Sequence, residues 1–210
     1  GIALGVAALI AVTSVMSGYQ QDIQDKILST NAHLVIQKYG IDFTEYEKII
    51  ESGLSVEGVN RAAPFTFTEA MVSTGAKGLG ILVKGIDPAR SGKVTDIENN
   101  LCKSVNGEGR CVRYAPGNLP EGALVELLTE TDGLAQVVVG LELFRKLGQP
   151  LGSIVSVTTP VGIAGARGNA PRRLHFRLGG VFESGMYEFD SRLLFAALES
   201  GQELMGYGKA

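Results

Sequence analysis

The sequence predicts an α+β domain that follows the end of a membrane-spanning helix. Its first sixteen residues, GIALGVAALIAVTSVM, carry no charge. Beyond them, short apolar runs bounded by glycine or proline are typical of strands, and apolar residues spaced three or four apart are typical of helices. These two patterns are interspersed along 210 residues, of which 45% are hydrophobic, enough for one or two ordinary domains with real cores.

Residues 1–16 predict part of a membrane span. As a helix they reach about 24 Å, short of the roughly 30 Å hydrocarbon core, so they look like a span cut at its start. A signal peptide is the alternative, but no basic segment precedes the apolar run and no clean cleavage site follows it. Apolar residues then recur at Met16, Tyr19, Ile23 and Ile27, so we expect the helix to continue as an amphipathic stalk.

Three further elements follow the stalk. The stretch HLVIQ (33–37) is predicted to be a strand. The stretch DFTEYEKIIES (42–52) is predicted to be a helix capped by Asp42, because Glu45 three residues later completes a capping box. The runs EAMVST and LGILVKGI flank GAKG and predict a hairpin over residues 69–86.

The two cysteines, Cys102 and Cys111, lie in LCKSVNGEGRCV, where NGEG favours a turn. Their spacing predicts a disulfide that closes a small loop and contributes roughly 2–3 kcal/mol on the loop-entropy model. A disulfide implies an oxidising compartment. Two reduced surface thiols are the alternative interpretation.

The remaining elements alternate between helices and strands. A turn and a short helix are predicted in 87–101, and a strand, a helix ending at Gly148 and a second strand in 136–160. A strand that runs into a short helix is predicted in 191–205. No internal repeat or low-complexity tract is present.

The segment TTPVGIAGARGNAPRRLHF (158–176) predicts a long hairpin arm. Its glycines, asparagine and prolines disfavour a helix, whereas the following RLHFRL alternates apolar and basic residues like a strand that returns to the body. A connection longer than the usual two to five residues that carries the apolar residues Val161 and Ile163 tends to have a function. A hairpin with no partner is the alternative.

Charge and histidine content argue against several kinds of site. The formal net charge is −3, so no global basic field attracts nucleic acid. The only histidines, His33 and His175, lie far apart in sequence, so few residues are available as zinc ligands or as the base of a catalytic triad. Ser184 lacks the G-x-S-x-G frame of a nucleophile elbow, and we interpret Glu183 and Asp190 as solvated turn residues. We therefore predict no catalytic residue, no metal and no cofactor.

Four blocks of sequence cover nearly the whole chain in one order. The first is GIALGVAALIAVTSVMSGYQQDIQDKILSTNAHLVI, at 1–36. The others are VKGIDPARSGKVTDIENNL at 83–101, VVVGLELFRKLGQPLGSIVSV at 137–157 and VFESGMYEFDSRLLFAALESGQEL at 181–204. Together they resemble the lipoprotein-releasing ABC transporter permease family, LolC and LolE, within the wider group of MacB and FtsX permeases.

The resemblance implies a MacB-like periplasmic domain of the Porter and Sabre type. Residues 1–28 correspond to the end of the transmembrane helix and the stalk, and residues 29–85 to the first half of a Porter-like subdomain. Residues 86–210 correspond to a Sabre-like subdomain with a hook-like hairpin at 160–171, and the chain ends before the second Porter half.

The resemblance also implies a permease subunit in the bacterial inner membrane that extracts lipoproteins and passes them to a periplasmic chaperone like LolA. Because the chain has no Walker motif, ATP would be used by a separate LolD-like subunit, alongside a second permease subunit. The residues that match the hook and its supporting pad by position are Val161, Gly162, Ile163, Ala164, Pro171, Arg172 and Arg173.

Several alternatives stay open at this point. A MacB-like efflux permease would dock an adaptor protein through the same domain, and an FtsX-like signalling permease would regulate cell-wall hydrolases. Within the first family, the subunit could be of the LolC type, of the LolE type or a hybrid.

Overall fold

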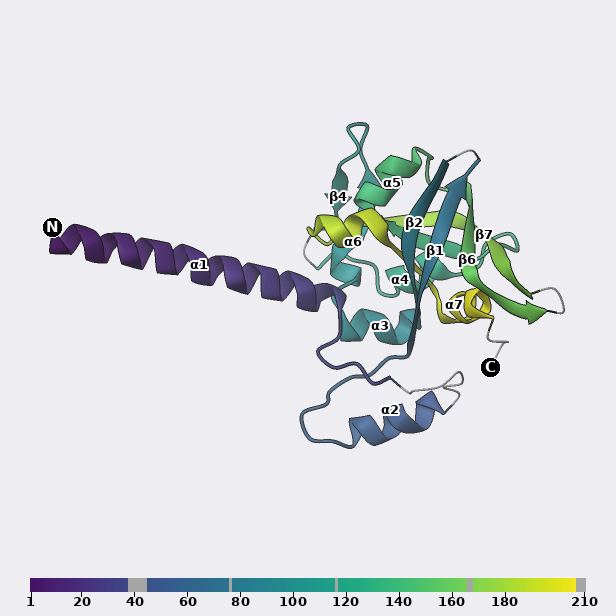
Figure 1. The fold of residues 1–210 in the computed structure, drawn as a ribbon, viewed down its shortest axis with the longest axis horizontal. Coiled ribbons are helices and arrows are strands. Elements are labelled where there is room, and N and C mark those ends of the chain that lie inside the picture. Colours follow the sequence, from purple (N-terminus) through teal and green to yellow (C-terminus); the bar gives the residue numbers. More distant parts are fainter. Residues whose placement is uncertain (38–44, 76, 116, 166–167, 207–210) are drawn as a thin grey trace.

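The computed structural model describes residues 1–37, 45–75, 77–115, 117–165 and 168–206. The N-terminal helix α1 (Ile2–Thr30) projects away from a body of strands and short helices (Figure 1). Within α1, the 23 residues Ile2–Gln24 are long and apolar enough to cross a membrane, and none of the apolar window is buried against the body. The predicted helix and its continuation are therefore confirmed, and its length and composition fit a span.

We expect the exposed helix to make the chain dependent on detergent. Leu4, Leu9 and Val15 are 79%, 67% and 74% exposed, which in water amounts to a large apolar patch. Without detergent the intact chain should self-associate, and deletion of residues 1–16 should give a monodisperse protein, as measured by size-exclusion chromatography with light scattering. A monodisperse intact chain that the deletion leaves unchanged would contradict the membrane assignment.

The segment after α1 departs from the sequence prediction in one place. Helix α2 (Tyr46–Leu54) confirms the predicted helix, but the predicted cap Asp42 lies outside the described residues, and Glu45 precedes α2 without a side-chain capping bond. The strand predicted at 33–37 is wrong. These residues pair with no strand in the described part of the chain, and Leu34 is 80% exposed. An apolar run forms a strand only where a second strand pairs with it.

Six strands close into a barrel in the order β1, β2, β8, β5, β7, β6, and β1 pairs back with β6. The pairs β2–β8 and β5–β7 are parallel and the others antiparallel. The β1–β2 hairpin was predicted. The strands are β1 (Phe65–Thr74), β2 (Lys77–Ile86), β5 (Gln136–Gly140), β6 (Ile154–Gly165), β7 (Gly168–Phe182) and β8 (Leu193–Ala197).

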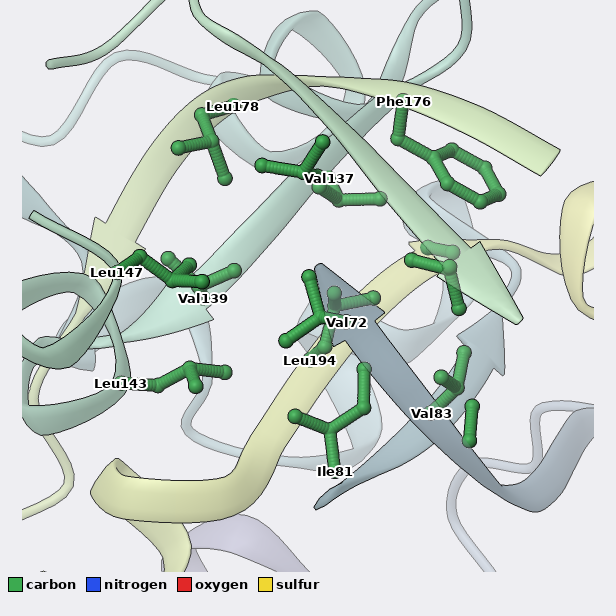
Figure 2. Close-up of a cluster of buried hydrophobic side chains, with 14 of the residues drawn as sticks. Val72, Ile81, Val83, Val137, Val139, Leu143, Leu147, Phe176, Leu178 and Leu194 are labelled. Carbon is green, nitrogen blue, oxygen red and sulfur yellow. The ribbon is translucent and has the colours of Figure 1, made fainter. Parts of the chain in front are cut away.

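Apolar side chains fill the barrel (Figure 2). A second cluster lies on the outer face of β5 and β8. Val137 and Val139 belong to the interior cluster, whereas Val138 packs in the second cluster with Phe182 and Phe195, whose rings meet edge to face at 5.1 Å. Because both faces of β5 are buried, its sequence QVVVG is apolar without alternation.

Short helices and one small hairpin cover the barrel. Asp87 caps α3 by accepting from the backbone N–H groups of Ala89 and Arg90, and the predicted stop at Gly148 ends α5 with a left-handed φ of 62°. These elements are α3 (Pro88–Val94), the 3₁₀ helix η1 (Glu98–Asn100), β3 (Cys102–Val105), β4 (Cys111–Arg113), α4 (Ala123–Leu128), α5 (Leu141–Leu147), α6 (Tyr187–Arg192) and α7 (Leu198–Met205).

The predicted subdomain boundary between residues 85 and 86 falls within the barrel, since β1 precedes it, β2 ends at Ile86 and the other four strands follow it. The Porter-like and Sabre-like division stays a prediction.

Candidate functional site

The predicted hook, residues 160–171, is the outer part of the β6–β7 hairpin. β1 pairs with β6 only over Ser156–Thr158, and β5 pairs with β7 only from Arg177 onward. Beyond these points the two arms pair, among the described residues, only with each other. The hairpin extends past the barrel at the end of the molecule opposite to the start of α1 (Figure 1).

The predicted contact residues fall on both arms of this hairpin. Val161, Gly162, Ile163 and Ala164 lie in β6, where Ile163 pairs with Ala170 after a shift of register that begins at Thr159. The side chains of residues 161–170 lie outside the described part of the structure. Pro171, Arg172 and Arg173 follow in β7, and both Pro160 and Pro171 are exposed.

Arg172 and Arg173, predicted to form one pad, point in different directions. Arg173 is exposed, and its Nε donates to Thr158 Oγ1 at 3.3 Å across the strand pair. Arg172 is half-buried, and its Nη2 lies 3.9 Å from Glu203 Oε1 on α7. Neighbouring residues of a strand face opposite sides, so only Arg173 belongs to the open outer face of the sheet. There it lies on the same face as His175, whose Nδ1 is 3.0 Å from Ser156 Oγ.

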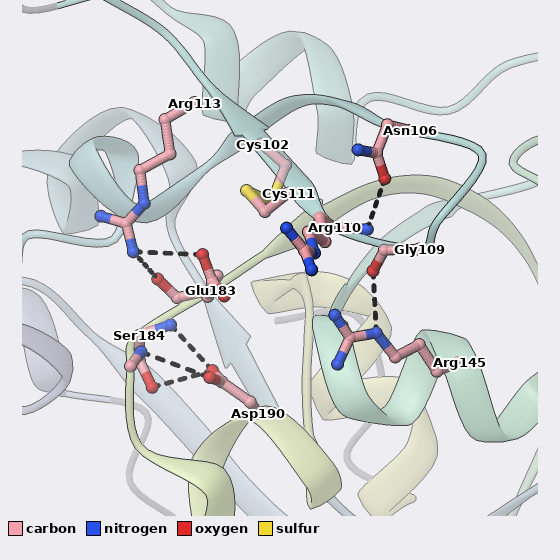
Figure 3. Close-up of a disulfide and its surroundings, with 11 residues drawn as sticks. Cys102, Asn106, Gly109, Arg110, Cys111, Arg113, Arg145, Glu183, Ser184 and Asp190 are labelled. Atoms are coloured by element: carbon pink, nitrogen blue, oxygen red, sulfur yellow. Dashed lines mark hydrogen bonds and ion pairs between the residues drawn. A yellow bond between two sulfur atoms is a disulfide. The ribbon is translucent and has the colours of Figure 1, made fainter.

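The two cysteines join β3 to β4 (Figure 3). Their sulfurs lie at bonding distance, 2.01 Å, with the Cα atoms 5.4 Å apart. The loop that they close is ordered by Asn106, whose Oδ1 accepts from the N–H groups of Glu108 and Arg110. Arg145 on α5 donates from Nε to the carbonyl oxygen of Gly109 at 2.8 Å. The disulfide hairpin is thus held against the body at its tip.

Asp190, interpreted from the sequence as solvated, is buried, with 5% of its surface exposed. Its Oδ1 accepts from Ser184 N–H and Ser184 Oγ, each at 2.8 Å, and its Oδ2 accepts from Gly185 N–H at 3.3 Å (Figure 3). Burial raises the pKa of Asp190, and the bonds from Ser184 and Gly185 oppose that rise. The solvated interpretation was therefore wrong, and this carboxylate organises the turn after β7.

No group of three or more potential metal-ligating side chains occurs in the part of the chain that the structure describes. Three features of the described residues remain: a protruding hairpin, the exposed Arg173 at its base and a long exposed apolar helix. Their chemistry suits contact with a membrane and with a protein partner.

Comparison with known proteins agrees with this picture. The model of the MacB-like periplasmic core domain family matches residues 1–208. The lipoprotein-releasing system transmembrane protein LolC of Neisseria meningitidis is 28% identical over 204 residues, 97% of this chain and 44% of that protein. The corresponding LolE of Haemophilus influenzae is 32% identical over 107 residues, 47% of this chain and 25% of that protein.

A solved structure, the extracellular domain of the noncanonic ABC-type transporter YknZ from Gram-positive bacteria, is 16% identical with a TM-score of 0.42, covering 76% of this chain and 66% of that one. The chain spans about 44% of the length of the LolC relative that it matches.

Proposed function

Because this chain belongs to the MacB-like periplasmic core domain family, we propose that it is the periplasmic part of an ABC transporter permease that releases lipoproteins. In this proposal the permease lies in the bacterial inner membrane, extracts a lipoprotein and passes it to a LolA-like periplasmic chaperone. A LolD-like subunit hydrolyses the ATP, and a second permease subunit completes the membrane part. The names of the LolC and LolE relatives support lipoprotein release as the transported process.

The protruding hairpin is the observation that carries the chaperone step. It lies at the opposite end of the molecule from the start of α1, so if α1 spans the membrane, the hairpin faces the periplasm (Figure 1). Among the described residues, the two arms beyond Thr159 and Arg172 pair only with each other, so no further strand separates this part of the hairpin from a soluble partner. In this proposal the apolar residues Val161 and Ile163 of β6 enter a groove that otherwise holds acyl chains, while Arg173 at the base meets acidic groups at the rim.

The proposal assigns mechanical work and docking to this chain. A lipoprotein that leaves the membrane exposes its acyl chains to water, so its transfer requires the acceptor to be in place before release. The hook supplies that placement by holding the chaperone beside the permease. In this account no bond is made or broken by residues of this chain.

Calorimetry tests the proposal directly. The full-length permease in lipid nanodiscs is titrated with a LolA-like chaperone and, separately, with a periplasmic adaptor protein of the efflux type. Saturable binding of the chaperone supports the proposal. Binding of the adaptor together with no binding of the chaperone overturns it in favour of an efflux permease.

Arg173→Glu should weaken chaperone binding more at low salt than at high salt. Arg173 is exposed at the base of the hook, and among the described residues its side chain contacts Thr158 on the adjoining strand and pairs with no carboxylate, so its charge is available to an acidic partner. Exposed rim charges act chiefly through association rate and salt dependence. Surface plasmon resonance at two ionic strengths measures both. Arg110→Glu is the control, because Arg110 is also exposed but lies in the disulfide loop beside Glu108. Equal losses in the two variants would contradict the assignment.

A further inference from the structure

The base of the hook is tied to α7 by both members of one cross-strand pair. Thr159 in β6 pairs with Arg172 in β7, at the last position before the register shifts. Thr159 is fully buried, and its Oγ1 donates to the carbonyl oxygen of Leu204 at 3.1 Å. Arg172 extends toward the neighbouring residue of α7, Glu203, with 3.9 Å between Nη2 and Oε1. Two side chains on opposite arms thus reach the same helical turn.

Helix α7 is itself fixed to the barrel. Leu204 is fully buried and belongs to the cluster that fills the barrel. Gly201 packs so closely on β2 that a Cβ added there would lie 2.9 Å from the Cα of Gly85. The carbonyl of Leu204 is in the last turn of the helix, where backbone oxygens lack partners within the helix, and the hydroxyl of Thr159 supplies one. The last turn of α7 is therefore a firm point of attachment.

The hairpin needs such an attachment to keep its direction. Beyond Thr159 it is a two-stranded ribbon with no further strand beside it in the described part of the chain, and an isolated ribbon is marginally stable and twists easily. The register shift after Thr159 interrupts the ladder at the point where the ribbon leaves the barrel. Contacts at this point have more influence on the direction of the tip than contacts further out.

We propose that Thr159 and Arg172 are positioning residues that set the direction of the hook by bracing its base against α7. The role in partner binding rests on the proposed function, whereas the role in hook direction does not. Arg172 then acts inside the molecule, and Arg173 is the arginine that meets the partner. Loss of the brace lowers the fraction of molecules whose hook points correctly, and the apparent affinity falls by the same factor.

The central test compares Thr159→Val, which keeps the shape but removes the hydroxyl, with Thr159→Ser, which keeps the hydroxyl. Both cysteines of this chain form the disulfide, and any cysteine elsewhere in the full-length permease is replaced by serine, so spin labels attach only to introduced cysteines. Labels at Asn169→Cys near the hook tip and Glu126→Cys on α4 report hook direction by electron–electron resonance, in the full-length permease in nanodiscs. We expect a narrow distance distribution for the parent and Thr159→Ser, and a broad one for Thr159→Val. Unchanged distances in Thr159→Val would overturn the proposal.

Binding kinetics supply the second readout. Thr159→Val should lower the association rate of the LolA-like chaperone roughly fivefold to tenfold, as expected for one buried hydrogen bond, and leave the dissociation rate unchanged. If Thr159→Val instead lowers the affinity only by raising the dissociation rate, Thr159 is part of the bound interface and the positioning role is overturned. If the parent shows the expected distances but binds no chaperone, the proposed function fails and the brace stands.

If Thr159→Val does not fold, a substitution on the surface of α7 tests the same brace. Glu203 is half exposed, so Glu203→Arg places a like charge beside Arg172 without disturbing the core. The distance distribution should broaden in Glu203→Arg and narrow again in the double variant Arg172→Glu with Glu203→Arg. If Glu203→Arg leaves the distribution as narrow as in the parent, Arg172 is not part of the brace.

Discussion

Ile163→Asp is expected to lower the affinity for the LolA-like chaperone at least thirtyfold. Ile163 lies in the outer part of β6, where the hairpin has left the barrel. Removal of an apolar anchor from the centre of an interface typically costs 2 kcal/mol or more, which is about thirtyfold, and a carboxylate entering an apolar groove adds its desolvation. Isothermal titration calorimetry with the full-length permease measures the change.

A matched control is available on the same strand. Ile154 is also an isoleucine of β6 and is 54% exposed, but it lies at the other end of the strand, next to the barrel. Ile154→Asp should therefore bind the chaperone as tightly as the parent. Circular dichroism should show both variants folded, because Ile154 is exposed and the pairing partner of Ile163 lies on the opposite arm of the hairpin, outside the barrel. Equal binding by the two variants would mean that the hook is only a connector.

Asp190→Ala is expected to lower the free energy of unfolding by about 3–4 kcal/mol, because it leaves several buried donors without an acceptor. Those donors are the N–H and hydroxyl of Ser184 and the N–H of Gly185. Denaturant unfolding of the detergent-solubilised chain measures the loss. Glu188→Ala, an exposed carboxylate on the same helix, is the control and should be nearly neutral. A similar small loss of stability in both variants would mean that Asp190 is a solvated turn residue after all.

The pH dependence of stability provides a separate check on Asp190. Burial raises its folded pKa above the ordinary value near 3.8, so the folded state binds the proton more tightly than the unfolded state. The stabilising contribution is therefore complete below the unfolded pKa and is lost as pH rises through the folded pKa. As pH rises from the unfolded pKa through the folded pKa of Asp190, the free energy of unfolding of the parent should fall relative to that of Asp190→Asn. If the stability difference between the parent and Asp190→Asn does not change with pH, the pKa of Asp190 is not raised by folding.

Local patterns in the sequence predicted those elements whose cause is local. The β1–β2 hairpin follows from a turn between two apolar runs, and the end of α5 follows from Gly148. The closure of the barrel by the β1–β6 pair joins segments more than 80 residues apart, and no short pattern encodes it. The wrong strand at 33–37 has the same origin, because strand formation depends on a partner elsewhere in the chain.

The hairpin arm at 158–176 was predicted and is confirmed by the β6–β7 pair, whereas its role as a partner-binding site stays a prediction. The alternation of RLHFRL placed Arg173 on the same face as His175. The same alternation, extended one residue back, puts Arg172 on the other face with Leu174, a consequence that the prediction of a single pad did not include. That signal separates the two arginines, although positional matching to a family pad grouped them. The contact of Thr159 with Leu204 spans 45 residues and depends on where α7 packs, so the sequence gives no sign of it.

In the described part of the chain, no further strand pairs with the outer edges of the two arms of the hook, and such edges ordinarily invite other chains to add strands and begin aggregation. Pro160 and Pro171 stand one on each arm, both exposed, close to where the ribbon leaves the barrel. Proline has no backbone N–H, so a ladder that continues along either edge lacks a hydrogen bond at that position. The two prolines therefore disfavour strand addition from a second copy at the base of the hook, where the ribbon leaves the barrel.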